Sequence, residues 1–130
     1  MPFYKYVGIS LRKLGLGRAV IQVKVGKHLT QGSGMAHGGV ASALVDSAVG
    51  LALCTLLDSQ EVITTVELKV NFLAPAKPGV LTASGNIIHK GKRIAVGEAE
   101  VRDSNRKIIA KGLVTYIILA NKRRPAISSS

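Results

Sequence analysis

The chain has 130 residues, of which 47% are hydrophobic, a size and composition that suit one globular domain with its own core. Eighteen Lys and Arg against seven Asp and Glu give a net charge of +11, which favours an anionic partner such as nucleic acid, an acidic membrane surface or a phosphorylated small molecule. The single cysteine, Cys54, excludes an intramolecular disulfide and predicts a reducing, cytoplasmic location, and the basic N-terminus lacks the long apolar core of a secretory signal.

The first 25 residues contain two predicted elements. Residues 3 to 14 repeat apolar side chains at helical spacing and predict a short amphipathic helix that packs on the sheet. The apolar positions are Phe3, Val7, Leu11 and Leu14. The stretch AVIQVKV, residues 19 to 25, is apolar at every second position and therefore predicts a half-buried strand.

The most apolar stretch is VASALVDSAVGLALCTLL, residues 40 to 57. Its length reaches the lower limit for a transmembrane helix. A carboxylate near the centre of such a helix costs roughly 2.5 to 3.5 kcal/mol, however, and Asp46 stands there among many small residues. We therefore expect no membrane span but a soluble helix that the rest of the protein covers on most sides.

Four further strands are expected after this helix, over residues 62 to 72, 80 to 89, 94 to 102 and 107 to 118. In the first of them one buried face is expected to carry Val66, Leu68, Val70 and Phe72. The turns KGKR and DSNR between the later strands are short and polar, which favours antiparallel pairing. The predicted class is α+β, with a sheet of about five strands folded against one long helix.

Residues 1 to 120 are expected to form a single domain, since no internal repeat divides them. The last ten residues, 121 to 130 (NKRRPAISSS), are charged and then small and polar, which is typical of a disordered basic tail. A nucleic-acid-binding tail is the alternative. The chain offers only five aromatic residues and no helix-turn-helix segment, so nucleic acid is not the expected partner.

Three segments together carry a resemblance to a known family: QGSGMAHGGVASALVDSA, TTVELKVNFLAPAKPG and HKGKRIAVGEAEVRD. They combine an HGG motif, an acid eight residues after the first of its glycines, and a strand that ends in a Pro-Ala-Lys-Pro turn. Over residues 18 to 118 the chain resembles the hotdog-fold acyl-CoA thioesterases of the phenylacetate-degradation (PaaI-like) type. The resemblance implies a long central helix wrapped by a strongly curved antiparallel sheet, and two protomers that build each active site at their interface.

Thioester hydrolysis requires a hydrogen-bond donor and a base or nucleophile, and the glycines and the acid of this motif could supply them. Water attacking a thioester leaves negative charge on the carbonyl oxygen, which a free N–H at a helix N-terminus stabilises. Gly38 is the expected donor, because a residue without a β-carbon lets the thioester approach; a simple turn into the helix is the alternative. The resemblance implies that Asp46 is the general base or the nucleophile, and a purely structural carboxylate is the alternative. Helical spacing places Asp46 on a face with Ser42, Ala43, Val49 and Gly50.

Three more residues are candidates for the catalytic site. The resemblance places Gln31 where these thioesterases carry Gln or Asn, so its amide is expected to bind the thioester oxygen or the attacking water. His37 is expected to anchor the loop or the substrate carbonyl rather than to act as the base. Thr65 matches a Ser or Thr that in some relatives positions water from the opposing subunit. Each residue also has an ordinary structural role available to it.

Coenzyme A carries a pyrophosphate and a ribose phosphate, and the resemblance implies that basic turns hold them. The expected contacts are Lys77 after the strand and Lys90, Lys92 and Arg93 in the HKGKR hairpin. Phe72, Pro75 and Gly91 complete the expected substrate-binding set. Any of the four cations could instead be a solvated turn residue.

The sequence therefore predicts an acyl-CoA thioesterase that releases a free acid and coenzyme A, with no metal and no cofactor. A dimer is expected, and the resemblance implies a tetramer of two dimers. The rival interpretation is a non-catalytic acyl-CoA-binding or nucleic-acid-binding protein on the same fold. Gly50 stands where some members of the fold carry a hydroxyl, so a mechanism that needs one there is excluded, and the motifs of the hydratase branches are absent. The acyl preference stays open.

Overall fold

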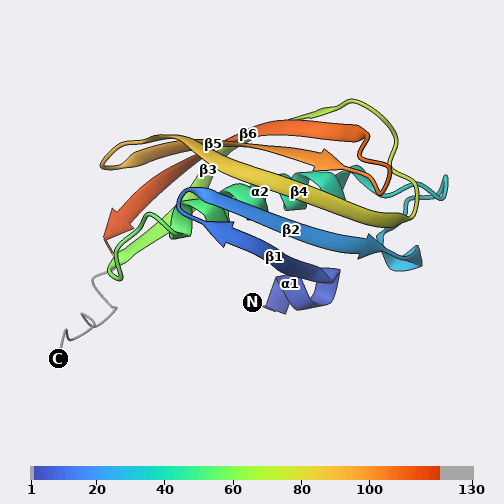
Figure 1. Cartoon of the computed structure of the whole chain (residues 1–130), viewed down its shortest axis with the longest axis horizontal. Helices are drawn as coiled ribbons and strands as arrows, with labels where there is room; N and C mark the ends of the chain where they lie inside the picture. Colours follow the sequence, from blue (N-terminus) through green and yellow to red (C-terminus); the bar gives the residue numbers. More distant parts are fainter. Residues whose placement is uncertain (1, 121–130) are drawn as a thin grey trace.

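The computed structural model describes residues 2–120, which form one sheet and one long helix with shorter elements before them. The elements in chain order are α1 (Pro2–Val7), β1 (Ile9–Gly15), β2 (Arg18–Val25), the 3₁₀ turn η1 (Lys27–Leu29), α2 (Gly38–Cys54), β3 (Glu61–Phe72), β4 (Gly79–Lys90), β5 (Ile94–Arg102) and β6 (Ile108–Ala120). All pairings are antiparallel, in the order β1-β2-β4-β5-β6-β3 (Figure 1). The α+β class and the four strands after the long helix are confirmed, and the expected tail, 121 to 130, lies outside the described residues.

The N-terminal segment differs from its sequence prediction, and the sheet has six strands rather than about five. The first helix ends at Val7, because Gly8 adopts a φ of +90°, and the chain continues as β1. Leu11 and Leu14, three residues apart, fit either a helix or a strand with a bulge, and the register with β2 shifts just after Leu11. Backbone pairing along the free edge of β2 decides in favour of the strand.

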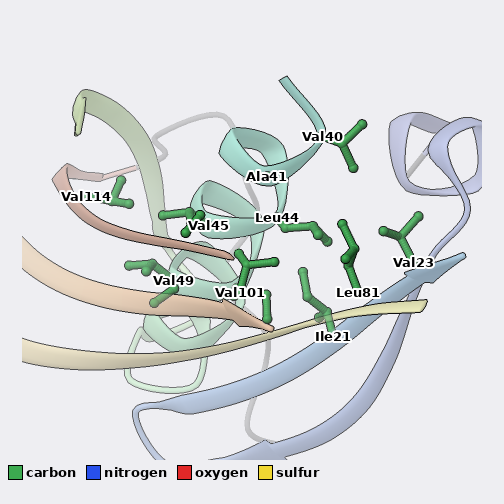
Figure 2. Packing of buried hydrophobic residues seen from close by; sticks show 14 of the residues in the cluster. Ile21, Val23, Val40, Ala41, Leu44, Val45, Val49, Leu81, Val101 and Val114 are labelled. Atoms are coloured by element: carbon green, nitrogen blue, oxygen red, sulfur yellow. The ribbon is translucent and has the colours of Figure 1, made fainter. Parts of the chain in front are cut away.

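The core lies between α2 and the face of the sheet against which this helix packs. Along the helix, the buried residues recur every three or four positions: Val40, Ala41, Leu44, Val45, Ala48, Val49, Ala52 and Leu53. Figure 2 shows several of these side chains directed at apolar residues of the strands, among them Ile21, Leu81 and Val101, all less than 2% exposed. Burying such side chains stabilises the fold by about 1.5 to 3 kcal/mol each.

Glycines in three neighbouring strands let the helix approach the sheet closely. Gly85 of β4, Gly97 of β5 and Gly112 of β6 all face α2. A β-carbon at Gly85 would lie 2.7 Å from the backbone carbonyl carbon of Ala48, and one at Gly112 would lie 2.8 Å from a methyl group of Val45. Overpacking of this kind typically costs about 1 to 3 kcal/mol. The three glycines therefore set the depth at which the sheet wraps the helix.

Helix α2 buries one face against the sheet, and a single chain covers its other face less completely. Its second face is only partly covered and carries Gly39, Ser42, Ala43, Asp46, Ser47, Gly50 and Leu51. Val49, expected beside Asp46, is fully buried against the sheet instead, because it lies on the core stripe of the helix. Within residues 2–120, no helix combines the length and the apolarity that crossing a membrane requires.

Strand β3 forms one edge of the sheet and is less buried than its sequence pattern predicts. Leu68, Val70 and Phe72 lie on the inner side, opposite inward residues of β6, as expected. Val66 does not join them, because the register shifts between Thr65 and Glu67 and leaves Val66 at the bulge, 55% exposed. Leu68 and Phe72 are themselves 39% and 57% exposed, so this edge presents uncovered apolar surface.

Candidate active site

The N-terminus of α2 presents one free backbone donor. His37 caps the helix, and its Nδ1 accepts a hydrogen bond of 2.9 Å from the N–H of Gly39. The His37 carbonyl accepts from Val40. Within residues 2–120, no acceptor is bonded to the N–H of Gly38, the first residue of the helix. This N–H lies at the positive end of the helix dipole and is available to an anionic ligand.

A cleft of about 440 Å³ adjoins this helix terminus. Its lining includes five residues that the sequence singled out: Gln31, His37, Gly38, Phe72 and Pro75. The Phe72 ring lies directly over Gly38, where a β-carbon would stand 3.4 Å from it. The Gln31 amide donates to Ser33 Oγ at 3.2 Å in an exposed loop. The structure therefore brings the expected oxyanion donor and part of the substrate set to one apolar cleft.

Asp46 lies two turns further along α2 and is held by two hydroxyl groups from the sheet. Thr65 of β3 donates from Oγ1 to Asp46 Oδ1 at 2.9 Å. The hydroxyl of Tyr116 on β6 lies 2.6 Å from both Oδ1 and the backbone carbonyl of Asp46 and shares its proton between them. Within the described residues, Oδ2 accepts no hydrogen bond. Thr65, expected from the opposing subunit, thus contacts the carboxylate of its own chain.

The Asp46 carboxylate borders a second cavity, of about 380 Å³, between α1, α2 and the inner side of β3 and β6. Its ionisable lining consists of Tyr4, Asp46, Cys54 and Tyr116. Burial, and then the neighbouring carboxylate, raise the pKa of Tyr116 far above its usual value. Burial likewise raises the pKa of Tyr4 and of the partly exposed Cys54 thiol. Asp46 is therefore the one carboxylate among the ionisable residues that line this cavity.

The two cavities share no lining residue, and this separation is the main feature of the site. Gly38 and Asp46 are eight residues apart on one helix, or about 12 Å along its axis. A thioester whose oxygen contacts the Gly38 N–H would need its base or nucleophile within about 3 Å of the carbonyl carbon or of the attacking water. One chain therefore does not bring its own Gly38 and Asp46 to the same carbonyl.

The basic turns expected to hold coenzyme A lie at opposite ends of the molecule. Lys77 follows Ala76, whose carbonyl accepts from Ala36, so it lies near the N-terminus of α2. The hairpin of Lys90, Gly91, Lys92 and Arg93 joins β4 to β5 beyond the other end of the helix, as Figure 1 shows. In one chain the two turns cannot hold the same nucleotide, because a helix of 17 residues, about 25 Å long, separates them.

Tyr116 was missed as a site residue by the sequence analysis. It contacts Asp46 across 70 positions of the chain. Its only sequence signal is a tyrosine at an inward position of the last strand, where a hydroxyl needs a partner when it is buried. The partner itself cannot be recognised without the fold, since it depends on the register that places Thr65 opposite Tyr116.

Comparison with known proteins defines the class. The model of the thioesterase superfamily matches residues 33–110. A Saccharolobus solfataricus protein with a provisional esterase name is 34% identical over 119 residues, covering 92% of this chain and 84% of its own. The 1,4-dihydroxy-2-naphthoyl-CoA hydrolase of Listeria monocytogenes is 29% identical over 124 residues, covering 95% and 100%. The solved structure of the E. coli PaaI protein from the phenylacetic acid degradation operon superimposes with a TM-score of 0.86 at 24% identity, covering 93% of this chain and 86% of that one, and shows the shared fold.

The chain is thus a hotdog-fold protein and belongs to the thioesterase superfamily. The resemblance to the PaaI-like branch is confirmed at the level of fold and family. The family and the hydrolase and esterase names of its relatives support thioester hydrolysis as its general activity.

Proposed function

We propose that the protein hydrolyses an acyl-CoA thioester to the free acid and coenzyme A, in an active site that two protomers build together. The observation that carries this proposal is the separation of the free Gly38 N–H from the Asp46 carboxylate in one chain. A two-fold axis that sets two α2 helices side by side in opposite directions would bring Gly38 of one protomer toward Asp46 of the other. The acyl-CoA hydrolase among the relatives supports the substrate class.

In the proposed reaction the thioester carbonyl oxygen accepts a hydrogen bond from the Gly38 N–H, which stabilises the charge of the tetrahedral intermediate. Gln31 borders the same cleft and binds the attacking water or the carbonyl oxygen. Asp46 of the partner takes a proton from water as general base or attacks the carbonyl carbon as nucleophile. His37 holds the loop through its cap contact with Gly39. Neither a metal nor a cofactor takes part in this scheme.

Two surfaces of the chain support the dimer. The partly covered face of α2 carries Asp46 among small residues, which allow a second helix to approach closely. Strand β3 has one free edge, and exposed apolar side chains, including Val66 and Phe72, lie along it. Free edges and apolar patches of this kind are normally covered by a partner. We infer a homodimer that pairs through these surfaces, and a tetramer of two such dimers.

Mixed dimers test the shared active site directly. We expect Asp46→Asn and Gly38→Pro each to be nearly inactive alone, because the first lacks the carboxylate and the second lacks the N–H. When the two inactive variants are co-expressed with different affinity tags, about half of the dimers are mixed, and each mixed dimer has one site with an intact Gly38 and an intact Asp46. The mixture should therefore recover about a quarter of wild-type thiol release.

The contrary result is equally clear. If each chain contained its own complete site, both sites of a mixed dimer would be defective, and the purified doubly tagged species would stay as inactive as its parents. A mixture of wild-type protein with the doubly substituted chain, Asp46→Asn with Gly38→Pro, is the matched control for subunit exchange. A wild-type protein that releases no thiol from any aryl, short-chain or medium-chain acyl-CoA would contradict the proposed activity as a whole.

The dimer also gives the second basic turn a reason to bind substrate. The hairpin with Lys90, Lys92 and Arg93 lies beyond the C-terminal end of α2. In an antiparallel pair of helices it approaches the Gly38 cleft of the partner, where Lys77 is near. We infer that the nucleotide of coenzyme A lies between the Lys77 turn of one protomer and this hairpin of the other.

Replacing Lys90, Lys92 and Arg93 together with Ala is expected to raise KM for acyl-CoA about tenfold and to change kcat less than about twofold. Phosphate contacts far from the carbonyl stabilise ground state and transition state alike, so their loss weakens binding alone. Steady-state kinetics at low salt measure both constants. The control removes three exposed cations from β1 and β2, with Arg12, Lys13 and Lys24 replaced by Ala. A wild-type KM in the hairpin variant would show that Lys90, Lys92 and Arg93 are solvated turn residues that do not contact the substrate.

Coenzyme A as the substrate and the absence of a disulfide both suit the cytoplasm, which we propose as the location.

A further inference from the structure

The contacts between α2 and the last strand give Tyr116 a role that rests on the proposed function and extends it. Tyr116 is 4% exposed, and its hydroxyl lies 2.6 Å from Oδ1 of Asp46. Thr65, its partner in the register between β3 and β6, donates to the same oxygen at 2.9 Å. Two hydroxyls from two adjacent strands thus hold one oxygen of the carboxylate.

Gly50 is the residue that makes this arrangement possible. It follows Asp46 by one helical turn, and a β-carbon built on it would lie 3.0 Å from the Tyr116 hydroxyl oxygen. The tyrosine ring is buried and has little room to move aside. Glycine in the middle of a helix destabilises the helix relative to alanine. The helix itself does not require a glycine at position 50, whereas the space for the Tyr116 hydroxyl does.

We propose that Tyr116 is a positioning residue for Asp46: with Thr65 it holds Oδ1, and it leaves Oδ2 directed to the reacting water or carbonyl, in the space that Gly50 keeps open. A carboxylate held by two donors keeps one side-chain rotamer and needs no reorganisation during the reaction. Burial keeps the Tyr116 hydroxyl protonated, so toward the carboxylate it acts only as a donor.

Few ionisable groups face Asp46 in its cavity. Tyr4 on α1, Cys54 on α2 and Tyr116 on β6 are the ionisable side chains that line its cavity, and burial raises the pKa of each. No Lys, Arg or His of residues 2–120 lines this cavity. His37 lines other cavities and is unchanged in the variants described below.

The test compares Tyr116→Phe, which removes only the hydroxyl, with Gly50→Ala, which keeps the hydroxyl and displaces it. Both are expected to lower kcat about tenfold and to leave KM within about twofold, because the carboxylate loses orientation rather than substrate contact. A hydroxyl that donates to a carboxylate favours its ionised form. Its removal therefore moves the acid limb of the kcat–pH profile to higher pH. Tyr6→Phe, at a tyrosine that is 85% exposed, is the matched control and is expected to keep wild-type kinetics.

A second measurement does not depend on turnover. Three-bond NMR couplings across the Cα–Cβ bond of Asp46 are expected to report one rotamer in the wild-type protein and rotamer averaging in Tyr116→Phe and Gly50→Ala. Melting temperature and dimer mass should stay close to wild type, and Gly50→Ala gains helix propensity. If no acyl-CoA is turned over by the wild type, the proposed function fails, and the couplings alone decide whether Tyr116 positions Asp46.

Two results would overturn the inference. The first is a Tyr116→Phe variant with wild-type kcat, an unshifted acid limb and a single Asp46 rotamer. The second is a loss of activity that follows only a fall in melting temperature or dimer mass, with a wild-type acid limb in the folded fraction. The latter would make Tyr116 a packing residue.

Discussion

Asp46→Asn is expected to lower kcat by about 10² to 10⁴ while the fold and the dimer persist. The carboxylate contributes mainly in the transition state, as general base or nucleophile, and the amide can do neither. The structural contacts survive the change, because Asp46 Oδ1 only accepts hydrogen bonds from Thr65 and Tyr116, and the oxygen of an Asn amide accepts them equally.

The Asn variant distinguishes chemistry from scaffolding when four quantities are measured on the same preparation. These are kcat, product affinity, melting temperature and oligomer mass. If Asp46 had only a structural role, its replacement would lower the melting temperature or produce monomers. Activity would then fall only in proportion to the loss of folded dimer. Full activity in a stable dimer would remove Asp46 from the mechanism and leave thioester hydrolysis without an assigned base.

Gly38→Pro is expected to lower kcat by about 10² to 10³, because proline has no N–H to donate to the oxyanion. Proline is well tolerated at the first position of a helix, which Gly38 occupies, and the preceding His37 has the extended backbone, with ψ of 140°, that proline requires before it. Helix α2 should therefore still form, and circular dichroism with melting temperature checks that it does.

Gly38→Ala is the matched control for the proline variant. It keeps the N–H and adds a β-carbon 3.4 Å from the Phe72 ring, which is an ordinary contact distance. We expect Gly38→Ala to retain kcat within about tenfold of the wild type, since only the oxyanion donor distinguishes the two variants. Equal losses in both variants would show that space at Gly38, and not its N–H, is what the reaction needs.

The strands that follow the long helix could be recognised from the sequence because their period is two and their turns are short and polar. This pattern specified β4, β5 and β6 to within two residues of their observed ends. The long helix was equally recognisable from its apolar length, and the HGG motif placed its start next to the observed first residue, Gly38. Local signals suffice here because each element buries one regular face.

Where two periodicities fit the same residues, only tertiary pairing decides. Leu11 and Leu14 satisfy a helix and a bulged strand, and the free edge of β2 selects the strand. Val66 appears inward by alternation, but the shift after Thr65 moves it out of the pattern. A bulge changes the face of every residue on one side of it, so an alternation pattern loses its predictive value there.

The sequence by itself determined the class of fold and the family and indicated the candidate site residues, since HGG, the acid eight residues later and the Pro-Ala-Lys-Pro turn are local motifs. Only the tertiary structure decided how these residues combine. It placed Gly38 and Asp46 in separate cavities, moved the two basic turns to opposite ends of α2 and brought Tyr116 to the acid. The physical reason is that a helix has a fixed rise per residue and therefore spaces its residues rigidly along one axis. Contacts between the strands and the helix depend instead on the strand register and on the glycines that set the distance between helix and sheet. A local sequence pattern encodes neither the register nor this distance.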